Sequence, residues 1–198
     1  MIKEIFGESI YITKMEQFKH EKILAVLMKS IPEDHHKSWK LCNVNSTFFE
    51  KKFLFNFNSD YKEIFIEEIL KQLKNMNGSI EYIIEDVWYN IYNKNDYQEP
   101  HHHIGIYSNT PTLSCIYCLK KSDAQLYFIN PSFIQQKLSG IDCVFDENDN
   151  YKEQYYPNIE EGTIIIFPSY LYHGVSPQKK TDDQRITMVC NIQISRKY

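Results

Sequence analysis

The sequence Glu99-Pro100-His101-His102-His103 holds three of the chain's seven histidines in a row, directly after a proline. If this segment ends a strand, its side chains alternate between two faces, so His101 and His103 point one way and His102 points the other. Two imidazoles on one side of a strand form half of a metal site, and a further ligand must come from elsewhere. A bare His-x-His motif is more often a polar, solvated loop, so the flanking sequence has to decide between the two.

The chain around this stretch is predicted to be mainly β from Ile80 onward. Five short segments there are rich in β-branched and aromatic residues and are bounded by Asn, Asp, Pro or Gly: 82–92, 112–119, 125–129, 163–167 and 185–194. No helical pattern separates these segments, which favours a sandwich, a barrel or a jelly roll.

The first 79 residues have a mixed pattern. We expect a strand at 9–13, a helix at 15–29 and a second helix that begins at Asp60 and ends at Asn77-Gly78. The apolar stripes of the two helices are Phe18, Ile23, Leu24 and Leu27, and Phe65, Ile69, Leu70 and Leu73. The polar segment 33–46, with His35 and His36, is predicted to lie at the surface, and the aromatic-rich segment 47–57 to be extended.

His173 is the candidate for the third metal ligand, because it follows a buried strand that breaks at Pro168. Arg185 comes twelve residues later, at the head of another strand. Period 2 divides that strand into one face with Arg185, Thr187, Val189 and Asn191, and a second with Ile186, Met188, Cys190 and Ile192. The second face is continuous core. The first begins with a cation and a hydroxyl, which burial would not tolerate without an anionic partner.

The strand before the triple histidine has a similar polar face. Trp88, Asn90 and Tyr92 share that face, and Asn90 stands eleven residues before His101. An amide, a phenol, an arginine and a hydroxyl that face a metal are what a bidentate carboxylate ligand needs. The metal chelates one end of such a ligand and the arginine binds the other.

Taken in order, these motifs resemble the 2-oxoglutarate and Fe(II)-dependent oxygenases, in the branch related to prolyl hydroxylases that is often found in marine bacteria and their phages. Each motif is weak alone, but the ordered set is strong and covers most of the chain. The matching segments are Ile5-Phe6 with 9–12, Trp88-Tyr89-Asn90, 97–103, 113–117, 126–131, 167–177 and Arg185-Ile186-Thr187.

The resemblance implies a double-stranded β-helix, a cupin-like jelly roll that is mainly β with flanking helices (α+β). It implies a single oxygenase domain over residues 1–198, in which 1–79 form a mixed, helical support region and 80–198 the jelly-roll catalytic core. It also implies Fe(II) bound by His101, His103 and His173.

The cosubstrate residues follow from the same resemblance. Arg185-x-Thr187 is similar to the Arg-x-Ser/Thr pair that holds the far carboxylate of 2-oxoglutarate. Asn90-x-Tyr92 is similar to the Asn-x-Tyr pair that holds the cosubstrate in the nucleic-acid demethylases of the superfamily. Ser114 and Tyr117, on a neighbouring strand, either line the same pocket or are plain core. No side chain is expected to act as a general acid or base.

The implied reaction uses molecular oxygen and decarboxylates 2-oxoglutarate to succinate while an amino-acid or peptidyl side chain, or a small metabolite, is hydroxylated. The long aromatic segment 132–161 and the insert 104–111 are expected to shape the substrate pocket. A net charge of −4 and the absence of a Lys/Arg cluster argue against nucleic acid as the substrate. The sequence indicates no oligomeric state.

One position departs from the majority pattern, because most of the superfamily has His-x-Asp where this chain has His101-His102-His103. A neutral histidine in place of a carboxylate leaves the site one positive charge higher, which still favours a dianionic chelator. A register one step later, His103-Ile104-Gly105, resembles oxygenases that leave a coordination position for halide.

Three further alternatives stay open: a three-histidine cupin dioxygenase that does not use 2-oxoglutarate, a zinc hydrolase, and a non-catalytic jelly-roll binding protein that keeps the metal for structure. In the first two, Arg185, Thr187 and Asn90 have no assigned role.

The composition sets outer bounds. Hydrophobic residues make up 42%, enough for a core, and no apolar run approaches the length of a membrane span. The first residues lack the pattern of a signal peptide, so we expect a cytoplasmic protein. The five cysteines are predicted to be reduced, small, buried hydrophobes. Cys115 and Cys118 form a C-x-x-C motif, but on a strand they point to opposite faces, which disfavours a zinc or redox site.

Overall fold

The computed structural model describes residues 1–30, 44–48, 59–105, 110–144, 151–181 and 183–195. The predictions for Cys42, His35, His36 and residues 49–57 therefore lie outside the described residues. In chain order the strands and helices are β1 (Ile2–Ile5), β2 (Glu8–Lys14), α1 (Gln17–Ser30), β3 (Asn45–Ser46), α3 (Ser59–Met76), β4 (Glu81–Tyr92), β5 (Gln98–His101), β6 (Leu113–Lys120), β7 (Leu126–Ile129), α4 (Phe133–Ser139), the 3-10 turn η1 (Ile141–Cys143), β8 (Gln154–Tyr155), β9 (Thr163–Pro168), β10 (His173–Val175) and β11 (Arg185–Ser195).

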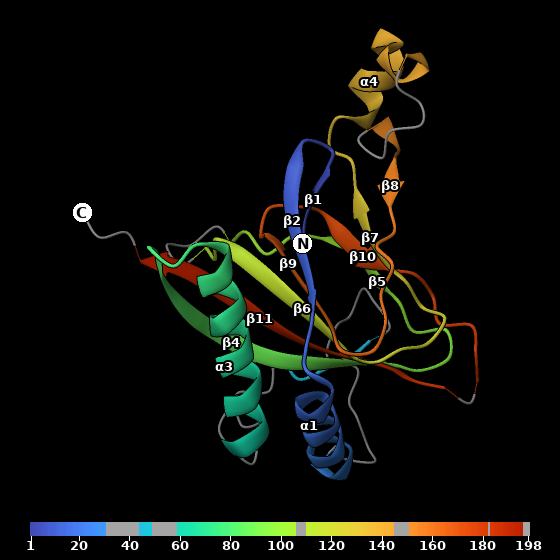
Figure 1. The fold of residues 1–198 in the computed structure, drawn as a ribbon. Coiled ribbons are helices and arrows are strands. Elements are labelled where there is room, and N and C mark those ends of the chain that lie inside the picture. Colours follow the sequence, from blue (N-terminus) through green and yellow to red (C-terminus); the bar gives the residue numbers. More distant parts are fainter. Residues whose placement is uncertain (31–43, 49–58, 106–109, 145–150, 182, 196–198) are drawn as a thin grey trace.

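The strands form two antiparallel sheets. The larger sheet has the order β1-β2-β9-β6-β11-β4-β3, and the smaller has the order β5-β10-β7-β8. Helices α1 and α3 lie on one face of the larger sheet, and the smaller sheet lies on its other side (Figure 1). The predicted architecture, mainly β with helices that flank one sheet, is confirmed. The five strands predicted from Ile80 onward correspond to β4, β6, β7, β9 and β11, and each lies within one residue of its predicted bounds at both ends.

Side-chain alternation along β11 divides the interior into two cores, as the sequence predicts. Ile186, Met188, Cys190 and Ile192 pack in the core between the larger sheet and the helices. Val189 belongs to the core between the two sheets, with Trp88 and Tyr92 of β4. Arg185, Thr187 and Asn191 are on this same inner face, where they line a cavity. The space between the sheets is therefore where polar groups gather.

The helices bury the expected stripes with one exception. Phe65, Ile69 and Leu73 of α3 are fully buried, and so are Ile23 and Leu27 of α1. The prediction for Phe18 is wrong, because this side chain is 64% exposed. Five residues separate Phe18 from Ile23, which is about 140° around a helix, whereas His20, three residues before Ile23, takes the buried position.

A buried carboxylate holds the two helices together. Glu68 of α3 is almost fully buried and accepts hydrogen bonds from Lys19 Nζ of α1 at 2.6 Å and from Gln72 Nε2 at 2.6 Å. Gln72 in turn accepts a hydrogen bond from the Tyr11 hydroxyl of β2 at 3.0 Å. The network fixes the helix pair on the sheet whose other face carries the cavity. The hydrogen bond from Lys19 to Glu68 raises the pKa of that lysine.

The segment 132–161 contains more structure than a plain loop. It includes α4, η1 and β8, and α4 extends away from the two sheets (Figure 1). Cys143 in this segment is exposed, so the prediction that the cysteines are buried is wrong there, whereas Cys115, Cys118 and Cys190 are buried. Cys115 and Cys118 pack in opposite cores, as expected for their spacing on a strand. Among the helices that the structure describes, none has the length and apolarity needed to cross a membrane.

We expect Glu68→Ala to lower the free energy of unfolding by about 2 kcal/mol, because it removes the buried acceptor of Lys19 and Gln72. Urea unfolding monitored by circular dichroism measures the change. Glu67→Ala, at an exposed neighbouring position on the same helix, is the matched control and should change stability by less than about 0.5 kcal/mol. Equal losses in the two variants would contradict a specific role for Glu68.

Candidate metal centre

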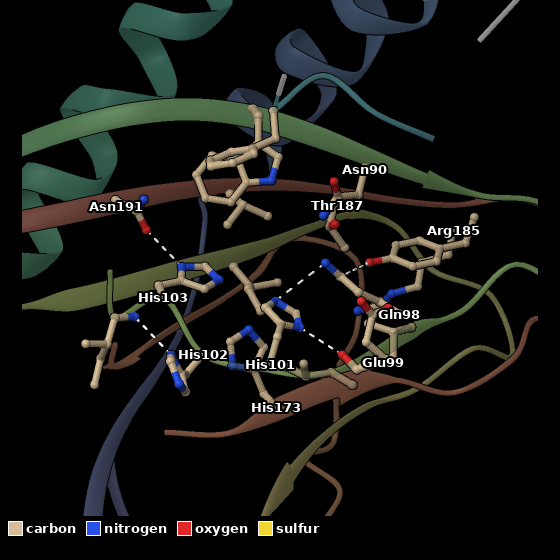
Figure 2. A pocket seen from close by; sticks show the side chains of 18 of the residues that line it. Asn90, Gln98, Glu99, His101, His102, His103, His173, Arg185, Thr187 and Asn191 are labelled. Atoms are coloured by element: carbon tan, nitrogen blue, oxygen red, sulfur yellow. Dashed lines mark hydrogen bonds between the residues drawn. The ribbon is translucent and has the colours of Figure 1, made fainter. Parts of the chain in front are cut away.

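Three histidines from two segments converge between the two sheets. His101 ends β5 and His173 begins β10, and the two residues face each other directly in the antiparallel pairing of these strands. One ring nitrogen from each of His101, His103 and His173 lies within 4.8 Å of the others (Figure 2). The three side chains that the sequence nominated as metal ligands are therefore brought together in one cluster.

The backbone explains how His101 and His103 reach this cluster. Gln98 pairs with Val175 while His101 pairs with His173, so β5 contains one more residue than β10 over this stretch. Such a bulge re-aims side chains, and here it points both Gln98 and His101 into the cavity. His103 follows the strand, and its backbone N–H donates to the Ser169 carbonyl at 2.8 Å. This bond ties the His-x-His segment to the loop that leads into His173.

Each of the three rings has its Nδ1 held by an acceptor. Nδ1 of His101 lies 2.9 Å from the Glu99 carbonyl oxygen, and Nδ1 of His173 lies 2.9 Å from the Leu171 carbonyl oxygen. Nδ1 of His103 lies 2.8 Å from Asn191 Oδ1. Because these oxygens only accept hydrogen bonds, each Nδ1 carries a proton and each Nε2 keeps its lone pair for a metal.

Burial keeps the three imidazoles neutral. It is the main cause that lowers the pKa of all three, to about 4 for His103 and well below the usual range for His173. The positive charge that each ring would place on the others lowers the pKa of His103 and His173 further. Metal binding requires neutral imidazoles whose Nε2 lone pair can coordinate the ion.

His102 points away from the cluster, as the strand alternation predicts. Its ring packs edge-on against Tyr172, with ring centroids 4.7 Å apart, and its Nδ1 accepts a hydrogen bond from the Ile104 backbone N–H. The register that starts at His103 would give His101 no role, although its ring is part of the cluster.

A cavity of about 270 Å³ extends from the histidines to Arg185. Arg185 is 2% exposed and heads β11, directly opposite Tyr92 of β4. Its Nη1 donates to the Ala124 carbonyl at 3.3 Å, but Nε and Nη2 are buried and have no hydrogen-bond partner among the described residues. The part of the chain that the structure describes contains no carboxylate in an ion pair with Arg185. A buried guanidinium in this state calls for an anionic ligand.

Asn90 and Thr187 lie between the metal-binding end and the arginine end of the cavity (Figure 2). The two residues face each other across β4 and β11, and both are buried. Asn90 Oδ1 has no hydrogen-bond partner among the described residues. Tyr92 also lines the cavity, but its hydroxyl donates to Gln98 Oε1 at 2.8 Å.

Ser114 and Tyr117, the other two residues considered for the cosubstrate pocket, do not line the cavity. Ser114 Oγ lies 2.8 Å from His103 Nδ1 and 3.0 Å from Ser169 Oγ, so it supports a histidine and does not line the cavity. Tyr117 lies three positions further along β6 and so points to the opposite face, where its hydroxyl lies 2.6 Å from His20 Nδ1. The expectation that Tyr117 lines the pocket is therefore corrected: it belongs to the core under the helices.

The described residues of segment 132–161 do not line the cavity, contrary to expectation; of the insert 104–111, Ile104 and Gly105 do. Two residues that help to form the site, Asn191 and Gln98, were not among the candidates predicted from the sequence. Asn191 could have been found, because period 2 places it on the face of Arg185 and Thr187. Gln98 could not, because a bulge that the sequence does not reveal turns it into the cavity.

Comparison with known proteins agrees with this site. Residues 86–191, more than half of the chain, match the family described as "Putative 2OG-Fe(II) oxygenase". The chain belongs to the 2OG-Fe(II) oxygenase family. This oxygenase is accordingly an enzyme that uses Fe(II) and 2-oxoglutarate, and the comparisons add no support to the alternatives without 2-oxoglutarate. No curated protein sequence matches the chain.

Solved structures of low sequence identity share the fold. A prolyl-4-hydroxylase from Pseudomonas putida has a TM-score of 0.63 at 10% identity, over 94% of this chain and 92% of that chain. The viral collagen prolyl hydroxylase from Paramecium Bursaria Chlorella virus-1 has 0.57 at 12%, over 94% and 96%. The epimerase SnoN from nogalamycin biosynthesis has 0.66 at 10%, over 94% and 78%. These likenesses confirm the double-stranded β-helix.

We expect Asn191→Leu to weaken divalent metal binding by about 10- to 100-fold, because His103 Nδ1 then keeps only the Ser114 hydroxyl, which can donate as well as accept and so does not fix the tautomer of the ring. Asn191→Asp keeps an acceptor there and should bind the metal at least as well as the unchanged protein. Anaerobic calorimetric titration with Fe(II) measures both affinities. Gln193→Leu, two positions along the same strand, is the control, and an equal loss in that variant would refute the role of Asn191.

Proposed function

We propose that this oxygenase hydroxylates an amino-acid or peptidyl side chain, or a small metabolite, with iron bound by His101, His103 and His173. In this proposal Arg185 and Thr187 bind the distal carboxylate of 2-oxoglutarate, and Asn90 contacts the same molecule between the arginine and the metal. Tyr92 acts on it through Gln98, since its hydroxyl already donates to that residue.

The buried Arg185 carries the proposal. Its Nε and Nη2 are two donors without a partner among the described residues, at one end of a cavity whose other end holds the histidines. A planar guanidinium binds a carboxylate through two parallel hydrogen bonds. 2-Oxoglutarate has a carboxylate at each end, so it satisfies the arginine with one end while the keto-acid end reaches the metal.

The histidine cluster also supports the proposal, because its ligand set suits Fe(II). Three neutral imidazoles grouped on one side of a metal leave positions on its other side for the cosubstrate and oxygen. When bound, the iron and 2-oxoglutarate together supply the oxidising chemistry, with succinate as the coproduct. The protein's own side chains hold the reactants in place, and no described residue of the cavity is needed as a general acid or base.

Three neutral ligands also change the charge of the site. A site with two histidines and one carboxylate would neutralise part of the metal charge, whereas three neutral histidines neutralise none of it. Glu99, whose Oε2 is buried without a hydrogen-bond partner, is the one carboxylate among the described residues that line the cavity. Arg185 is the one permanent cation among the described residues that line the cavity. Both positive charges favour a dianionic chelator over a neutral one.

The part of the cavity wall beside His103 is aromatic and apolar. Trp88 packs against Phe48 with ring centroids 4.9 Å apart and against His103 at 5.7 Å. Ile104 and Gly105 line the cavity nearby. This surface supports an apolar group as the part of the substrate that approaches the metal, and it fits a peptidyl or amino-acid side chain.

The domain assignment is part of the proposal. β2 pairs with β9, so the first residues of the chain complete the larger sheet that residues 80–198 form. This supports one oxygenase domain over residues 1–198. A cytoplasmic location and the exclusion of nucleic acid stay predictions.

Succinate formation tests the proposed function. The protein should convert 2-oxoglutarate to succinate only when Fe(II) and oxygen are present. Arg185→Met should raise the KM for 2-oxoglutarate by about 100-fold, because a charged, two-point contact is lost. Lys120→Met removes a cation outside the cavity and serves as the matched control, with an unchanged KM. Succinate formation that is equal in Arg185→Met and the control would refute the assignment of Arg185.

The three-histidine set is the single observation that favours a second candidate, a zinc hydrolase or a dioxygenase that does not use 2-oxoglutarate. Either enzyme would turn over its substrate without forming succinate. Metal analysis of protein purified without a histidine tag, with succinate measured in parallel, separates them from the proposed oxygenase.

A further inference from the structure

Gln98 lines the cavity beside His101, and the proposed function names it only as the residue that Tyr92 contacts, without saying which atom of the cosubstrate its carboxamide would meet. It is 7% exposed and comes from β5, three residues before His101. Its Nε2 lies 3.5 Å from His101 Nε2, and its Oε1 accepts a hydrogen bond from the Tyr92 hydroxyl at 2.8 Å. The side chain thus joins β4 of the larger sheet to the metal-binding edge of the smaller sheet (Figure 2).

Tyr92 sets the direction of the carboxamide. A tyrosine hydroxyl that donates to Oε1 leaves the NH₂ group on the other side, and that group faces His101 Nε2. Tyr92 is itself 1% exposed and held in the core, so this orientation is fixed by packing as well as by the hydrogen bond. The amide is therefore pre-oriented before any ligand binds.

The contact between Gln98 and His101 is weak in this arrangement. At 3.5 Å it is too long for a strong hydrogen bond. His101 Nε2 also gives up its lone pair when it binds a metal, because its Nδ1 proton is committed to the Glu99 carbonyl. When a metal binds His101, the Gln98 amide N–H is therefore left buried beside it and needs another acceptor.

We propose that the Gln98 amide N–H donates to the oxygen atom of 2-oxoglutarate that binds the metal beside His101. This inference rests on the proposed function, since it requires iron and 2-oxoglutarate in the cavity. Arg185 fixes the far end of the cosubstrate and Gln98 fixes its near end, so the two donors together set the orientation of the molecule. Tyr92 serves as the positioning residue that holds Gln98.

Anaerobic titration of the Fe(II)-loaded protein with 2-oxoglutarate tests the proposal, with both the dissociation constant and the visible charge-transfer band recorded. Gln98→Leu should weaken 2-oxoglutarate binding by about tenfold or more, as expected for a lost hydrogen bond to a charged group, and should shift the band maximum. Fe(II) affinity without 2-oxoglutarate should stay within about twofold, because the three histidine ligands remain.

Two further variants separate this role from a structural one. Gln98→Glu keeps the shape of the side chain but places a negative charge beside the cosubstrate carboxylate, so it should weaken 2-oxoglutarate binding more than Gln98→Leu. Tyr92→Phe should weaken binding less than Gln98→Leu and should add little to it in the double variant. Gln72→Leu, which removes another buried carboxamide on the helix side of the larger sheet, should leave the 2-oxoglutarate affinity unchanged.

The outcomes distinguish this proposal from the one on which it rests. If the unchanged protein forms the band and Gln98→Leu matches it in affinity and band position, the role of Gln98 is refuted and the proposed function stands. Tighter Fe(II) binding by Gln98→Glu in the absence of 2-oxoglutarate would instead make residue 98 a metal ligand and also overturn the proposal. If the unchanged protein binds neither Fe(II) nor 2-oxoglutarate, both proposals fail.

Discussion

The pairing of β5 with β10 is the contact on which the metal centre depends. It places His101 directly opposite His173, so two of the three clustered histidines, from distant parts of the sequence, meet through the pairing of these strands. The close approach requires a glycine at position 174, because a Cβ there would lie 2.6 Å from the Tyr127 hydroxyl and 2.9 Å from the Gln98 carbonyl oxygen. The same pairing carries the bulge that turns Gln98 inward. The positions of His101, His173 and Gln98 therefore have a common origin in one short strand pair.

Burial gives the site its electrostatic character. Burial lowers the pKa of His103 and His173, so these imidazoles are neutral, and the guanidinium of Arg185 is buried at the other end of the cavity. The result is a cavity with a permanent cation at one end and three imidazole lone pairs that can coordinate a metal at the other. Such a cavity is matched to a ligand with negative charge at both ends. Asn90 and Thr187, which face each other between these ends, add polar groups without adding charge.

Much of this arrangement could be predicted from the sequence, because it depends on period 2. Alternation along one strand places Arg185, Thr187 and Asn191 on the cavity face, and the same rule shows why Tyr117 lies on the other side of the sheet from Ser114. What could not be predicted depends on features without a local signature. The three residues of β10 are too few to show a strand pattern, and the bulge in β5 leaves no mark in the composition. Phe18 was misplaced because its apolar side chain suggested burial, although its angle on the helix excluded it.

X-ray absorption at the iron edge of the Fe(II)-loaded protein tests the central claim most directly. Three imidazoles should be found around each iron, and the addition of 2-oxoglutarate without oxygen should add oxygen ligands while all three imidazoles remain bound. A metal shell with fewer than three imidazoles, or one that does not change when 2-oxoglutarate is added, would contradict the account.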